Sequence, residues 1–62
     1  MMKLREGFKY KCVSGGSDFT VGKVYTGIRD SSGDVVIISD KGMEYDDWGL
    51  DMWDIKLEEE EQ

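Results

Sequence analysis

Eight glycines and no proline divide this 62-residue chain into short segments. The glycines stand at positions 7, 15, 16, 22, 27, 33, 42 and 49. Glycine weakens helices and is common in turns, whereas a strand needs only about 5–6 residues. The spacing therefore predicts short strands joined by turns. A chain of this length has material for one core, so we expect a single small domain.

The first segment between glycines alternates apolar and basic side chains over residues 8–13. In a strand this period of two places Phe8, Tyr10 and Cys12 on one face and the intervening lysines on the other. We therefore expect a half-buried first strand. Cys12 is the only cysteine, and the chain has no histidine to activate it, so we expect a buried, unreactive thiol.

Two further strands are predicted in the middle of the chain. Residues 24–29 are rich in β-forming side chains, and Gly27 inside them indicates a bend that turns the strand from one sheet to the other. Residues 30–34 have the composition of a hairpin loop with a late glycine. Residues 35–38 are Val-Val-Ile-Ile, which predicts a central strand covered on both sides.

The last two strands are predicted at residues 43–48 and 52–57, with a turn at 40–42 before the first of them. We expect the inward-facing side chains of the final strand to be Trp53, Ile55 and Leu57. Residues 58–62 contain four glutamates and no apolar side chain, which predicts a frayed, solvated tail. The expected organisation is therefore one all-β domain over residues 1–57, followed by an acidic tail.

The segment between the first two strands has the spacing F-x-x-G-K-x-Y from Phe19 to Tyr25, and we expect Phe19 or Val21 to fold back onto the core. With the later hairpin and Trp48, it resembles the small SH3-like β-barrel proteins of tailed phages and prophages, mostly uncharacterised. The resemblance covers residues 3–57. It implies a five-stranded SH3-like barrel with a short 3₁₀ turn before the last strand, and a phage origin, but no particular reaction.

The charge of the chain is strongly uneven along its length. Residues 1–29 hold six basic and two acidic side chains, net +4, whereas residues 30–62 hold two basic and twelve acidic ones, net -10. The overall charge of -6 argues against a uniformly basic nucleic-acid or membrane-surface binder. An acidic second half suits a partner with a basic surface, although single-sign runs of charge are also commonly just solvated faces.

The sequence predicts no catalytic, metal or cofactor site. The chain has no histidine, and residues 30–34 lack the spacing of a calcium loop, so no metal site, catalytic residue or cofactor is expected. A domain this small rarely encloses the pocket that an enzyme needs. No stretch approaches the roughly 20 apolar residues of a membrane span, so we expect a cytoplasmic protein, in the host cell if phage-encoded.

The function that we expect is protein binding, because tryptophan and tyrosine are favoured at the centres of protein interfaces. The predicted binding patch combines acidic and aromatic residues of the second half, namely Glu44, Tyr45, Asp46, Asp47, Trp48 and Asp51. It would modulate or inhibit a host protein. Whether Trp48 and Trp53 are exposed or close the ends of the barrel is left open by the sequence.

The sequence also allows two functions other than binding a different protein. The basic first half could bind single-stranded nucleic acid through Lys9, Lys11 and Lys23, because small barrels can present lysines and aromatic rings to a strand. Against this stands the acidic second half, which repels phosphate. The second alternative is a homodimer or larger homo-oligomer, because a core of this size is marginal alone.

Overall fold

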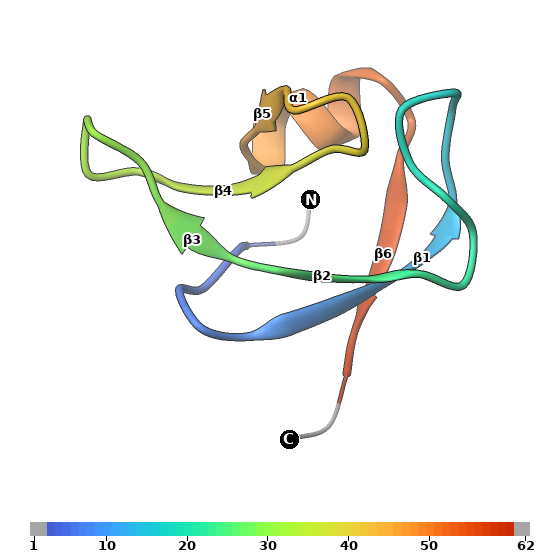
Figure 1. Ribbon diagram of the computed structural model, residues 1–62, viewed down its shortest axis with the longest axis horizontal. Helices are drawn as coiled ribbons and strands as arrows, with labels where there is room; N and C mark the ends of the chain where they lie inside the picture. Colours follow the sequence, from blue (N-terminus) through green and yellow to red (C-terminus); the bar gives the residue numbers. More distant parts are fainter. Residues whose placement is uncertain (1–2, 61–62) are drawn as a thin grey trace.

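The computed structural model describes residues 3–60. The elements in chain order are β1 (Lys9–Ser14), β2 (Val24–Thr26), β3 (Ile28–Arg29), β4 (Val35–Ile38), β5 (Glu44–Tyr45), α1 (Asp47–Met52) and β6 (Lys56–Glu59). The strands form two small antiparallel sheets, ordered β2-β1-β6 and β3-β4-β5 (Figure 1). The regular secondary structure of the described residues is thus mostly strand, as the glycine spacing predicts, with one short helix.

Gly27 is the corner at which the chain passes from one sheet to the other, between β2 and β3 (Figure 1). Its N–H donates to the carbonyl of Phe8 at 2.9 Å, and its own carbonyl accepts from the N–H of Gly7 at 2.9 Å. A Cβ at this position would collide with the backbone carbonyl oxygen of Arg5. The predicted bend is confirmed, and it divides the single strand expected at residues 24–29 into two.

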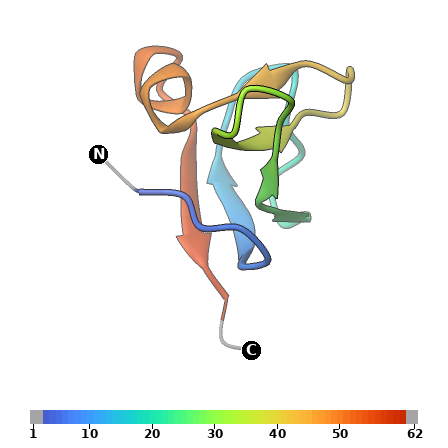
Figure 2. The ribbon, with the colours of Figure 1, turned by 90° about the vertical axis from the view of Figure 1, so that its left-hand side faces the viewer.

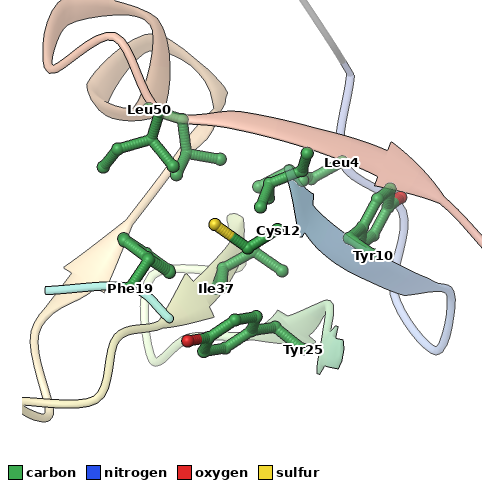
Figure 3. Close-up of a cluster of buried hydrophobic side chains, with 9 residues drawn as sticks. Leu4, Tyr10, Cys12, Phe19, Tyr25, Ile37 and Leu50 are labelled. Carbon is green, nitrogen blue, oxygen red and sulfur yellow. The ribbon is translucent and has the colours of Figure 1, made fainter. Parts of the chain in front are cut away.

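The hydrophobic core lies between the two sheets and α1 (Figure 3). Tyr10 and Cys12 of β1 are fully buried, as the alternating pattern predicts, and so is Ile37 of β4. Phe19 is the loop residue that folds back onto them, and its ring meets that of Tyr25 edge-on at 5.0 Å. The loop before β2 therefore contributes to the core through one anchored side chain.

The hairpin between β3 and β4 matches the prediction for residues 30–34. The Asp30 carboxylate accepts from the N–H groups of Ser32 and Asp34, both at 2.9 Å, and Gly33 has a φ of 89°. This Asx-type turn needs a residue that tolerates the left-handed region, which glycine does at no steric cost. The strand that follows this turn, β4, lies in the middle of its sheet, between β3 and β5, as the sequence predicts.

The helix α1 is not predicted by the sequence pattern. It occupies residues 47–52, where the end of one strand, a turn and the start of the next were expected. Asp46 caps it, because its carboxylate accepts the N–H of Gly49 at 2.6 Å, and Leu50 is its buried residue. The strand expected at residues 43–48 is only β5, and an α-helix precedes the last strand in place of the 3₁₀ turn.

The inward orientation expected for Trp53 is also wrong. Trp53 ends α1 and is exposed, and the next residue, Asp54, has a φ of 58°. A residue in this left-handed conformation interrupts the extended backbone, so the alternation starts only after it. Ile55 and Leu57 are buried as predicted.

The acidic tail expected at residues 58–62 is wrong for its first residues. Glu58 and Glu59 belong to β6 and pair with Lys11 and Tyr10 of β1, and the N–H of Glu60 donates to the carbonyl of Lys9 at 2.8 Å. Residues 61 and 62 lie outside the described residues. The C-terminal strand therefore lies beside the N-terminal one (Figure 1), and Figure 2 shows α1 above the start of β6.

Candidate binding groove

Four large apolar side chains are exposed around β5 and α1. Met43, Trp48, Met52 and Trp53 expose 58%, 60%, 58% and 65% of their surface, respectively. Trp48 and Met52 are four residues apart, so they share one face of the helix. Contiguous exposed apolar surface of this kind commonly marks an interaction site.

These side chains surround a hollow of about 440 Å³. Met43 and Tyr45 line it from the β5 side, while Trp48, Met52 and Trp53 line it from the α1 side. We call this hollow the β5–α1 groove. Its walls come from two elements that are adjacent in sequence, so the short connection at Asp46 holds them together.

Acidic side chains also line the β5–α1 groove. Asp30, Glu44 and Asp46 contribute to its surface, and the Asp46 carboxylate is fixed in place by the N-cap hydrogen bond. We call these three residues the acidic rim. Carboxylates gathered around an apolar hollow attract a positively charged partner and repel an acidic one.

A second hollow of about 330 Å³ adjoins the groove, because Tyr45 and Trp53 line both. Its other lining residues include Ser17, Asp18 and Ile55, and we call it the Asp18 pocket. The Tyr45 hydroxyl donates to Asp18 Oδ2 at 2.9 Å. This hydrogen bond, together with nearby Lys41, lowers the pKa of Asp18, so its carboxylate is charged at neutral pH.

The structure divides the predicted binding patch into two groups. Glu44, Tyr45, Asp46 and Trp48 all line the β5–α1 groove. The other two, Asp47 and Asp51, are four residues apart on a different face of α1 and line a separate small cleft of about 40 Å³ with Leu50. Asp46 and Asp47 also line a further hollow together, so the two groups meet at the start of α1, while Asp51 lies apart from the groove.

Met43, Met52 and Trp53 line the groove although the sequence pattern does not indicate that they belong to the site. One signal was present: the spacing of four between Trp48 and Met52 matches one helix face. It could be used only after a helix had been assigned there. The alternating pattern predicts Trp53 in the core and Met43 on a strand face, with no partner element to complete a groove.

The lysines of the nucleic-acid alternative are accompanied by carboxylates. Lys23 Nζ lies 2.7 Å from Asp40 Oδ1, and Lys11 is directly opposite Glu58 across the β1–β6 pair. Lys9, the third, is exposed on β1 opposite Thr26. Two of the three positive charges therefore stand beside a negative one, which weakens any attraction to phosphate.

Residues 3–60 offer few features of a metal site, a reactive thiol or a membrane-spanning helix. Within this range, no three acidic or cysteine side chains lie together in a way that could hold a metal ion. Cys12 is buried, and its burial raises the pKa of the thiol. The same part of the chain contains no helix that is long and apolar enough to cross a membrane. No protein-family model, curated protein or solved structure matches this chain.

Proposed function

We propose that this chain is a non-enzymatic protein-binding module that engages a partner with a basic surface through the β5–α1 groove and its acidic rim. The partner is a host protein, which the chain modulates or inhibits in the cytoplasm of the host cell as the product of a phage or prophage. The phage origin and the assignment of the fold to the SH3-like barrels rest on the resemblance around Phe19 to Tyr25. The passage of the chain between sheets at Gly27 supports that assignment.

The observation that carries the proposal is the exposure of four large apolar side chains around one hollow. Met43, Trp48, Met52 and Trp53 cover the walls of the β5–α1 groove and remain in water in the isolated domain. Covering such a surface with a partner releases the water next to it, and tryptophan is enriched among the residues that dominate binding energy. The acidic rim then selects for partners of positive charge.

The test is affinity capture from a bacterial lysate with the parent chain and two groove variants, Trp48→Ala and Glu44→Lys. We expect the parent to retain a protein with a basic surface, and both variants to lose it. Circular dichroism checks that the variants are folded. The captured protein is then purified, and its affinity for the parent is expected to fall as salt rises, because the rim contributes electrostatic attraction.

A matched control is Asp51→Lys, which changes the charge by the same amount as Glu44→Lys but lies on a different face of α1. It should bind as the parent does. If the folded groove variants retain every partner of the parent, the groove is not the binding surface. If Asp51→Lys weakens binding as much as Glu44→Lys, only the overall charge matters and the proposed groove has no specific role.

A further inference from the structure

The β5–α1 groove and the Asp18 pocket are adjacent hollows that share a wall. Tyr45 and Trp53 line both hollows. On one side of this wall, Met43, Trp48 and Met52 offer an apolar surface. On the other side, the pocket holds the carboxylate of Asp18. A single extended segment that crosses the wall would therefore meet the exposed Trp48 and methionine side chains of the groove and then the Asp18 carboxylate.

The apolar half suits one large hydrophobic side chain. Two of its exposed residues, Met43 and Met52, have flexible and polarizable side chains that adapt to the shape of what they contact. The indole of Trp48 adds a rigid aromatic surface. A leucine, phenylalanine or methionine of a partner would bury its surface here against all three.

The Asp18 pocket suits a guanidinium group. The exposed Trp53 indole lines the pocket together with the Asp18 carboxylate, so a planar cation can stack on the ring and donate to the carboxylate at once. Lysine lacks the planar fork and stacks less well. Arginine is thus the side chain that uses both features.

The Asp18 carboxylate can bind a guanidinium group and give up only a weak existing interaction. Its Oδ2 is engaged by the Tyr45 hydroxyl, while Oδ1 lies 3.4 Å from Lys41 Nζ and 3.3 Å from Ser17 Oγ. The Lys41 side chain is 61% exposed and that of Asp18 is 22% exposed, so water reaches this long ion pair and it contributes little. An incoming guanidinium can replace Lys41 while the Tyr45 hydrogen bond stays.

Charge argues against a second copy of this chain as the occupant of the groove. A symmetric dimer across the groove would bring the two acidic rims together, with Glu44 and Asp46 of each copy near the same residues of the other. Such like-charge contacts oppose association. A basic partner segment has the opposite effect.

Resting on the proposed function, we propose that the β5–α1 groove and the Asp18 pocket form one composite site for a partner segment that carries a large apolar side chain close to an arginine. The apolar side chain fills the groove beside Trp48. The arginine passes Tyr45, stacks on Trp53 and pairs with Asp18. The site thereby requires both residue types within a few positions of each other.

The test uses synthetic nine-residue peptides with one leucine or phenylalanine and one arginine, separated by zero to four glycine or serine residues. In matched peptides the arginine is replaced by citrulline, lysine or glutamate. Binding is measured by fluorescence anisotropy of a labelled peptide. At the best spacing we expect the arginine peptide to bind about tenfold more tightly than the citrulline peptide, with lysine between them.

Protein variants then separate the two halves of the site. We expect Trp53→Ala and Asp18→Asn to remove the preference for arginine over citrulline, and Trp48→Ala to weaken both peptides equally. Asparagine keeps an oxygen for the Tyr45 hydroxyl, and Trp53 is exposed, so both proteins should fold. Val21→Ala, at an exposed position that lines neither hollow, is the control that should change nothing.

Three results would overturn the composite site: no peptide binding at millimolar concentration, equal binding of arginine and glutamate peptides, or an arginine preference that survives Trp53→Ala. A dimer of the parent chain in sedimentation that Trp48→Ala makes monomeric would also overturn it, because a second copy would then occupy the groove. If a captured host protein depends on Trp48 and Glu44 but not on Trp53 or Asp18, the proposed function stands and the composite site fails.

Discussion

Lys23 Nζ donates to Asp40 Oδ1 at 2.7 Å and so joins the loop before β2 to the turn after β4. The same carboxylate accepts from the Thr20 hydroxyl at 2.6 Å and from the Tyr25 hydroxyl at 3.0 Å. These hydrogen bonds, with that of Lys23 the largest cause, lower the pKa of Asp40 to about 2. One carboxylate thus holds together two connecting segments that adjoin strands of different sheets.

Asp40→Asn should destabilise the domain at neutral pH, because the amide cannot accept all three hydrogen bonds and loses the charge that pairs with Lys23. In the folded parent the Asp40 carboxyl has a pKa of about 2, below its ordinary value of 3.8. Its contribution to stability is therefore fully present above about pH 4 and is lost as the pH falls towards 2. Urea unfolding followed by circular dichroism at several pH values measures this.

The expected signature is a stability difference between the parent and Asp40→Asn that shrinks on acidification. The matched control is Asp54→Asn, because the Asp54 side chain makes an exposed ion pair with Lys56 at 3.6 Å, and asparagine tolerates its positive φ. It should unfold as the parent does at every pH. A constant gap between Asp40→Asn and the parent down to pH 2 would contradict the assigned ionisation.

Gly27→Ala should destabilise the domain by about 1–3 kcal/mol, the usual cost of forcing an extra group into a packed position. The new methyl group meets the backbone carbonyl of Arg5, which is itself held by the turn into β1 and cannot move as a side-chain end could. Thermal unfolding by circular dichroism gives the difference. Gly16→Ala is the control, because a Cβ there meets nothing within 4 Å. Equal stability of the two alanine variants would show that the corner tolerates a side chain.

Asp46→Ala and Asp46→Ser separate the two roles of this residue, as the cap of α1 and as part of the acidic rim. Alanine removes the acceptor for the Gly49 N–H, and loss of a cap costs about 1 kcal/mol. Serine keeps the cap and removes only the charge. We expect chemical unfolding to show lower stability for alanine alone, and binding of a basic partner to weaken in both. A serine variant as unstable as the alanine one would exclude the capping role.

Ending the chain at Leu57 should destabilise it by about 1–3 kcal/mol relative to a chain that ends at Glu60, the net value of a few backbone hydrogen bonds. The shorter chain loses the pairing of Glu58 and Glu59 with β1 and the bond from the Glu60 N–H to Lys9. Urea unfolding of the two chains compares them. Identical midpoints would mean that this end of β6 adds nothing to the domain.

The parts of the fold that could be predicted from the sequence are those with a local physical cause. The alternation around Tyr10 and Cys12 marks a strand with one buried face, and Gly27 and Gly33 mark a bend and a turn. Each of these features acts within a few residues, so a single sequence carries enough information. The branched residues of β4 likewise indicate its central place.

The helix α1 could not be predicted because its local signals are weak. It has six residues, too few for a helical period to emerge, and Gly49 lies inside it. The cap at Asp46 is a recognisable start, but an isolated aspartate occurs in turns as readily. Burial of Leu50 against the core stabilises the helix, and that contact involves residues far away in sequence.

The candidate site could not be predicted as a whole because α1 forms one of its walls. Without α1, Trp48 was expected on a strand and Trp53 inside the barrel, so the groove between them had no second wall. The pairing of Glu58 and Glu59 with β1 was hidden for a related reason: composition describes their side chains, which remain exposed, whereas the backbone makes the strand. Four members of the predicted patch nevertheless line the groove, because exposed acids and aromatic residues are concentrated in this one segment.

Both tryptophans of the chain lie outside the core, whereas Tyr10 and Tyr25 lie within it. The optical behaviour of the protein follows from this division. The indole fluorescence of the free domain already comes from rings in contact with water, so unfolding changes it little. The loss of structure is seen instead in the near-ultraviolet circular dichroism of the buried tyrosines. A shift of the emission to shorter wavelength reports that the β5–α1 groove has been covered.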